Sequence, residues 1–346
     1  PGIDAWRDAL RRFRRREILR IAARDICLGV ATPRIMEEIS DLADGVVAAA
    51  LERRRAEAPG GSAGSVVLCI IAFGKLGGRE LNYSSDIDLL GVCAAEGAAD
   101  AVEPATRLLE GLRGDLSSHT TEGYAYRVDF RLRPYGSSGE LSFTLPSLEA
   151  YYDHHAAPWE LQALLKARPI AGDASLGRAF LELARRRLMA PRPLSEVAAQ
   201  IETLRREALR ALARSVLTTT DIKTGLGGLR DVEFLAQGLQ LSHLFQHPSL
   251  AGGGTLAALS ALSREGILPS ETAGQLADDY IFLRRVEHFL QIYEDRQTHS
   301  LPRNPAQLRA LARLMLGSAA SSEQLLADLA ERFQRIRSHY EQILVR

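Results

Sequence analysis

The sequence predicts an α+β protein in which a mixed sheet with covering helices is joined to an all-α helical bundle. Two apolar runs of strand length, at residues 66–73 and 87–93, indicate buried strands. Residues 124–134 alternate between apolar and charged side chains, as a third strand does. Helical periodicity marks residues 2–58 and nearly all of the chain after residue 173. These observations together define the expected fold class.

Three parts are expected along the 346 residues, because the chain is too long for one small core. They are an N-terminal helical segment at 1–58, a sheet-containing domain at 59–172 and a helical bundle domain at 173–346. In the first part, Trp6, Leu10 and Phe13 recur at helical spacing among arginines, which we interpret as the solvated face of an amphipathic helix. The stretch APGGSAGS, 58–65, is expected to separate this part from the sheet.

The other elements follow from local signals, taken in order along the chain. A second helical pattern covers residues 33–55, and a further helix is expected at 101–119, between the second and third strands. Pro146 and Ser147 begin another helix. The last part is expected to form helices over 174–216, 230–246, 255–266, 271–298 and 306–344.

Charge and composition exclude several classes of protein. Lysine plus arginine and aspartate plus glutamate both number 43, and this balance argues against a broad nucleic-acid-binding surface. Cys27, Cys69 and Cys93 lie far apart without metal-ligand spacing, so we expect a reduced, cytoplasmic protein and no disulfide framework. The longest apolar run is about half of what a membrane-spanning helix needs, so no membrane association is expected.

The stretch FGKLGGRELNYSSDIDLLGVC, residues 73–93, carries the strongest functional signal. Asp86 and Asp88 are two residues apart, so on a strand their side chains share one face. Two carboxylates that close raise one another's pKa, and a divalent cation removes the conflict. Asp129 supplies a third carboxylate from a separate strand. Hard oxygen ligands of this kind favour Mg²⁺, and one or two such ions can assist displacement at phosphorus.

Phosphate-binding groups surround these carboxylates in the sequence. Gly74 directly follows a predicted strand, and its missing side chain would let backbone amides approach a phosphate. Arg131 and Arg133 fall on the same predicted strand face as Asp129, and a guanidinium can bind phosphate oxygens in pairs. The segment GKLGGRE lacks the spacing of a P-loop and of the GxGxxG dinucleotide pattern, so neither of those classes is supported.

A glycine turn, spaced serines, two nearby aspartates and a distant aspartate form a layout that resembles the palm of polymerase-β-like nucleotidyltransferases. Four longer stretches resemble the family of glutamine synthetase adenylyltransferases, which both add and remove adenylyl groups. They are FGKLGGRELNYSSDIDLL, YRVDFRLRPYGSSG, WELQALLKARPIAGD and IKTGLGGLRDVEF. The likeness runs from about residue 15 to the end of the chain. The family's full enzyme is similar to two such units in tandem, and this chain is long enough for one.

The resemblance implies roles for particular residues. Asp86, Asp88 and Asp129 would be the catalytic carboxylates and the ligands of Mg²⁺. The expected nucleotide and phosphate contacts are Gly74, Lys75, Ser84, Ser85, Arg131, Arg133 and Lys166. Only three lysines, Lys75, Lys166 and Lys223, occur beside 40 arginines, and all three fall in the matched stretches. A lysine kept against such a bias is one that a planar guanidinium replaces poorly, although Lys166 and Lys223 could equally be structural.

The direction of the reaction is open on the sequence alone. ELNYSSDID, VDFRLRPYGSSG, the arginine of GGLRDVEF and DRQTHSLP resemble the N-terminal, adenylyl-removing unit more than the C-terminal one. The resemblance then implies that phosphate attacks the phosphodiester between AMP and a tyrosine of glutamine synthetase, releasing ADP. The alternatives are adenylylation of that tyrosine from ATP and a docking unit without turnover. Glutamine synthetase, ATP or ADP, phosphate and the PII signalling protein are the implied partners.

Overall fold

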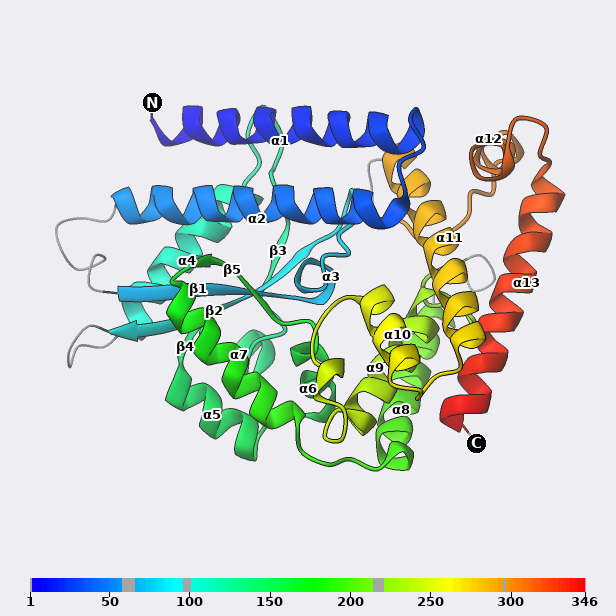
Figure 1. Ribbon diagram of the computed structural model, residues 1–346. Coiled ribbons are helices and arrows are strands. Elements are labelled where there is room, and N and C mark those ends of the chain that lie inside the picture. The colour runs from blue at the N-terminus through cyan, green and yellow to red at the C-terminus, as the bar shows by residue number, and fades with distance from the viewer. Residues whose placement is uncertain (1, 58–65, 96–100, 214–220, 295–296, 346) are drawn as a thin grey trace.

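The computed structural model describes residues 2–57, 66–95, 101–213, 221–294 and 297–345, and it confirms the α+β class (Figure 1). Helices α1 (Ile3–Ile26) and α2 (Thr32–Glu57) form the first layer. A small mixed sheet lies beneath α2, and further helices cover the opposite side of the sheet (Figure 1). No helix in the described ranges is long and apolar enough to cross a membrane.

The sheet has the order β3-β2-β1-β5, with β4 also paired to β2. Its strands are β1 (Val66–Phe73), β2 (Ile87–Ala95), β3 (Val128–Asp129), β4 (Ser142–Thr144) and β5 (Arg168–Gly172). Strand β1 is antiparallel to both β2 and β5, whereas β2 runs parallel to β3 and to β4. Strands β3 and β4 therefore share one edge of β2, with β3 at its start, where Asp88 lies.

Alternation along β1 divides the interior into two cores. Leu68, Ile70 and Ala72 pack with helices α1, α2 and α4 (Val102–Ser117). Cys69, Ile71 and Phe73 point to the other face and belong to a second core cluster that continues to Leu344 near the end of the chain. Successive strand residues face opposite sides of a sheet, so an uninterrupted apolar run is what a strand buried on both faces requires.

Helices make up the regular structure of the described part of the chain after residue 173. They are α7 (Ala174–Leu188), α8 (Leu194–Ala213), α9 (Leu229–His243), α10 (Thr255–Arg264), α11 (Ser270–Glu294), α12 (Pro305–Leu316), α13 (Ser322–Tyr340), the short η2 (Pro248–Leu250) and a π-helical turn at Glu341–Val345. The expected helix at 306–344 is broken, because Gly317 adopts φ +108° at the end of α12 and Ser321 caps the start of α13.

Shorter elements connect the sheet to these helices. They are α3 (Gly74–Gly77), η1 (Gly136–Ser138), α5 (Leu145–His154) and α6 (Pro158–Leu164). The core cluster on one face of the sheet includes side chains from α7 through α13, so the sheet and the helical half share one apolar interior. The division at 59–172 and 173–346 stays a prediction, and the expected separating stretch at 58–65 lies outside the described residues.

The expected strand at 124–134 is wrong in its extent, since only Val128 and Asp129 pair with the sheet. The reason is local. Oδ1 of Asp129 accepts the backbone N–H of Arg131 at 2.7 Å, which bends the chain directly after the strand. A further turn follows, in which the N–H of Arg133 bonds the carbonyl of Phe130. Arg131 and Arg133 consequently leave the strand face on which alternation had placed them.

Candidate nucleotidyl-transfer site

The edge of the sheet brings two of the predicted carboxylates together. In the parallel pairing of β2 and β3, Asp88 lies directly opposite Asp129. Directly paired residues on neighbouring strands present their side chains to the same face. Asp86 precedes β2 by one residue and is close enough for its charge, together with that of Asp129, to act on Asp88. Asp88 and Asp129 thus lie opposite one another at the start of β2, and the charge of Asp86 reaches Asp88.

Gly74 meets this carboxylate group from the end of β1. Its backbone has φ +57°, and a Cβ atom built on it would lie 2.5 Å from Oδ2 of Asp88. No other residue type combines that left-handed conformation with room for the carboxylate. Glycine is therefore required here for the close approach of Asp88, a reason that the sequence pattern alone did not provide.

Burial and the charges of Asp129 and Asp86 raise the pKa of Asp88 to about 7, against the opposing charges of Lys223 and Arg131. The carboxylate of Asp88, in contrast to its paired backbone, makes no hydrogen bond or ion pair with any residue of the described ranges. A carboxylate in this position is short of positive charge, which is the condition that a divalent cation relieves.

The other two carboxylates are engaged by arginines. Oδ1 of Asp86 accepts Nε–H of Arg127 at 2.5 Å, and Arg127 also donates to the carbonyl of Ser84. Asp129 forms a paired contact with Arg131, with Nη2 and Oδ2 2.6 Å apart. Although burial opposes it, the hydrogen bonds and charge of Arg131 hold the pKa of Asp129 below its usual value. Arg131 is available to exchange its carboxylate for a phosphate, since its side chain is 76% exposed.

In the described part of the chain, no three His, Cys, Asp or Glu side chains are gathered closely enough to form a metal-binding group. Asp86 and Asp129 are each paired with an arginine instead. The donor set itself fits Mg²⁺, since it consists of carboxylate oxygens around the charge-deficient Asp88. Metal dependence stays a prediction.

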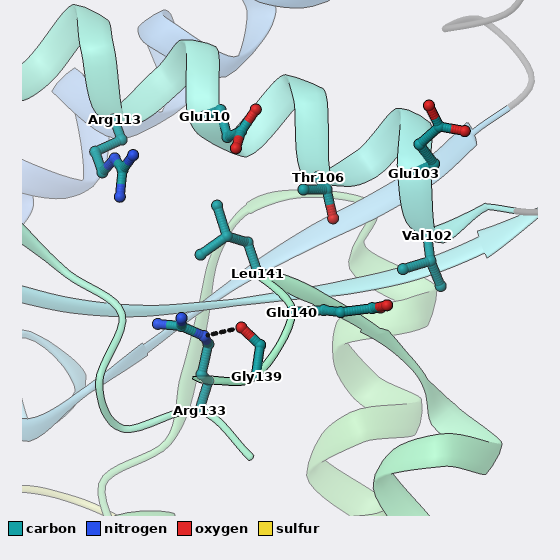
Figure 2. Close-up of a pocket in the computed structure, with 9 residues that line it drawn as sticks. All are labelled: Val102, Glu103, Thr106, Glu110, Arg113, Arg133, Gly139, Glu140 and Leu141. Atoms are coloured by element: carbon teal, nitrogen blue, oxygen red, sulfur yellow. Dashed lines mark hydrogen bonds between the residues drawn. The ribbon is translucent and has the colours of Figure 1, made fainter. Parts of the chain in front are cut away.

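Arg133, expected to bind phosphate, is 8% exposed and holds its own loop. Its guanidinium donates to the carbonyls of Phe130, Ser137 and Gly139, at 2.8, 3.1 and 3.0 Å. Figure 2 shows it at one side of an open cavity of about 600 Å³, opposite Arg113 of α4. The pocket is also lined by Glu103, Glu110 and Glu140, and none of Asp86, Asp88 and Asp129 lines it. The structure therefore gives Arg133 a loop-shaping role.

The predicted serines lie in the turn that leads into β2. The backbone N–H of Ser84 donates to Oε1 of Gln291 in α11 at 2.9 Å. Oγ of Ser85 accepts the backbone N–H of Asn82 at 3.3 Å. Oδ1 of Asn82 accepts Nη2 of Arg284 at 2.5 Å. The turn at residues 82–85, the serine turn, is thus hydrogen-bonded to helix α11. Phosphate contacts by Ser84 and Ser85 stay predictions.

Two of the three lysines are bound to buried glutamates. Nζ of Lys166 lies 2.7 Å from Oε2 of Glu80, and it also donates to Thr255. Nζ of Lys75 lies 3.1 Å from Oε1 of Glu287 in α11, and burial lowers the pKa of Lys75 to about 7 against the charge of that glutamate. For Lys166, these contacts favour the structural alternative that the sequence left open.

Sequence reasoning missed the polar side of helix α11. Arg284, Glu287, His288 and Gln291 are each at most 1% exposed, and together they contact the Gly74–Ser85 region and Asp25. Their positions recur every three or four residues, beside the apolar stripe of Leu283, Val286 and Leu290. That second, polar stripe was the available signal, because buried charges at helical spacing imply partners from another element.

A helix-covered mixed sheet that presents carboxylates from adjacent strands beside a glycine turn defines a nucleotidyltransferase-like protein. Comparison with family models agrees with this class. Residues 2–183 match the family described as glutamate-ammonia ligase adenylyltransferase, and residues 195–344 match that of GlnD PII-uridylyltransferase. The chain belongs to the glutamate-ammonia ligase adenylyltransferase family, which confirms the resemblance found in the sequence.

Curated relatives carry the name bifunctional glutamine synthetase adenylyltransferase/adenylyl-removing enzyme. The protein of Streptomyces avermitilis is 41% identical over 308 residues, covering 88% of this chain and 31% of the relative. That of Cutibacterium acnes is 40% identical, with 88% and 32% covered. That of Thioalkalivibrio sulfidiphilus is 35% identical, with 96% and 36% covered. The chain thus spans about a third of the length of these relatives.

Proposed function

We propose that this chain is a metal-dependent nucleotidyltransferase that removes AMP from an adenylylated tyrosine of glutamine synthetase by phosphorolysis. The observation that carries the proposal is the register of the sheet edge, where Asp88 lies opposite Asp129 and against Gly74. This is the arrangement expected of a polymerase-β-like palm. The names of the relatives supply the substrate, and the motifs around Asn82 and Arg230 favour the removing direction.

In the proposed reaction, an oxygen of inorganic phosphate attacks the phosphorus of the tyrosine-linked AMP. The bond from that phosphorus to the tyrosine oxygen breaks, the tyrosine recovers a proton, and ADP leaves. Mg²⁺ held by Asp86, Asp88 and Asp129 would supply positive charge to the phosphoryl oxygens. The guanidinium of Arg131, whose exposure supports such a role, would orient the incoming anion.

Several further expectations belong to the same proposal. The match of residues 195–344 to the PII-uridylyltransferase family supports the PII signalling protein as a partner of the helical half. Cys27 and Cys69 are not joined in a disulfide, which supports a reduced, cytoplasmic environment. The described residues after 173 support a helical bundle beside the palm.

The test mixes the purified chain with adenylylated glutamine synthetase, Mg²⁺ and inorganic phosphate, and measures ADP. We expect ADP to form with the unaltered chain and to be lost in Asp86→Asn and Asp88→Asn. Asp153→Asn, which alters a carboxylate paired with Arg187 on the surface, is the matched control and should leave the rate unchanged. Incorporation of AMP from ATP without ADP release would reverse the direction. Binding of glutamine synthetase without either reaction would identify a docking unit.

A further inference from the structure

Most of the cations expected to bind phosphate already have partners in the structure. Lys75 contacts Glu287, and Lys166 contacts Glu80. Arg131 contacts Asp129, and Arg133 donates to three backbone carbonyls. Only Arg131 among these four is exposed enough to change partner at little cost. A site that handles phosphoryl groups needs a further cation, because such groups carry charge on several oxygens.

Lys223 lies beside the site through a chain of direct contacts. The N–H of Ile222 donates to the carbonyl of His299 at 2.9 Å. Nδ1 of His299 lies 2.8 Å from Oε1 of Glu287, the same oxygen that receives Nζ of Lys75. Lys75 in turn follows Gly74 directly in the sequence. The turn that carries Lys223 is therefore fastened to the loop that contacts Asp88, although the two are far apart in the sequence.

The side chain of Lys223 makes no hydrogen bond or ion pair with any residue of the described ranges, and the same holds for Asp88. The chain of contacts thus joins two side chains of opposite charge, and neither one is paired within the described ranges. A metal ion on the carboxylate side and a phosphate on the ammonium side would satisfy both.

We propose that Lys223 is the cation that contacts a phosphate group of the substrate, so that the helical half completes a site begun by the sheet. This inference rests on the proposed function, which places a phosphoryl substrate at Asp88. The Lys223 backbone is held independently of its side chain, because its N–H bonds Oδ1 of Asp221 and its carbonyl accepts the N–H of Arg230. Truncation of the side chain is therefore expected to leave the turn intact.

The test compares Lys223→Ala with the unaltered chain by calorimetric titration, first with Mn²⁺ alone and then with ADP in the presence of Mg²⁺. We expect the ADP dissociation constant to rise roughly 10- to 100-fold, the range for losing a hydrogen bond to a charged group. Mn²⁺ binding should stay equal or become tighter, because a positive charge near Asp88 is gone. A merely structural role would weaken both and lower the melting temperature.

Arg230→Ala is the matched control, since it removes a nearby cation at the start of helix α9. The guanidinium of Arg230 lies over the ring of Phe234. ADP binding that is unchanged in Lys223→Ala, or that falls equally in Arg230→Ala, would overturn the inference. Failure of the unaltered chain to bind ADP would overturn it as well. ADP binding that depends on Lys223 would support the inference even if adenylylated glutamine synthetase releases no ADP. That combination would contradict only the proposed reaction.

Discussion

Replacing Asp88 by asparagine should make the metal-free protein more stable at neutral and alkaline pH. Burial, together with the charges of Asp129 and Asp86, raises the pKa of Asp88 from 3.8 to about 7. The folded protein therefore holds this proton more tightly than the unfolded chain does. The resulting stabilisation is fully present below the unfolded-state pKa and is lost as the pH rises through the folded-state value. Asparagine has no such proton to lose.

The size of the effect follows from how far the pKa of Asp88 is raised. A change of one in pKa corresponds to about 1.4 kcal/mol, so the unaltered chain loses about 4 kcal/mol of its free energy of unfolding once the pH is well above the folded-state pKa. Between about pH 5.5 and pH 8, roughly 2 kcal/mol of that loss should occur. The free energy of unfolding of Asp88→Asn, relative to that of the unaltered chain, should increase by this amount over the same interval.

The assay is urea unfolding with EDTA at both pH values, with Asp153→Asn as the control. Addition of Mg²⁺ at the higher pH should restore stability to the unaltered chain and not to Asp88→Asn, because only the former keeps the carboxylate. Parallel pH profiles for the two proteins would refute the claim that Asp88 is a buried carboxylate short of positive charge. The metal site inferred from it would lose its physical basis.

Three further predictions concern the surroundings of the site. Gly74→Ala should destabilise the fold by about 1–2 kcal/mol in urea unfolding, since φ is positive there, and should slow ADP release roughly 10- to 100-fold by displacing Asp88. Lys166→Met should cost about 3–5 kcal/mol by leaving Glu80 buried without its cation. Glu80→Gln in the same chain should recover part of that loss in a double-mutant cycle. Arg284→Met should lower the free energy of unfolding by a similar roughly 3–5 kcal/mol, because it removes the hydrogen bond between helix α11 and Asn82 of the serine turn. The loss should appear as a lower urea midpoint.

The positions of β1 and β2, and the pairing of Asp88 with Asp129, were predictable from the sequence, whereas β4 and β5 were not predicted. The short β3 needs only Val128 and Asp129 to bring Asp129 alongside Asp88, and Asp86 lies just before β2. The side-chain partners were not predictable in this way. Arg133 turns inward because backbone carbonyls of its own loop attract it, and alternation along a strand contains no information about a turn that ends the strand.

The lysines show the same limit over longer distances. Lys75 meets Glu287, which is 212 positions away in the sequence, and Lys166 meets Glu80, 86 positions away. Local motifs identified these lysines as unusual but could not say which of them a distant glutamate occupies. The folded structure is needed to distinguish them. Lys75 and Lys166 each contact a glutamate, whereas the side chain of Lys223 has no partner in the described ranges.

The apolar interior that runs from one face of β1 to Leu344 affects how the protein reaches its native state. During synthesis, Ile71 and Phe73 leave the ribosome about 100 residues before α7, whose Phe180 packs edge-on against Phe73, and the later helices of the cluster follow still further on. Until α7 has formed, this face of the sheet exposes apolar surface to the cell. Folding dominated by such distant contacts is slow and prone to aggregation, so the nascent chain is a natural client for chaperones.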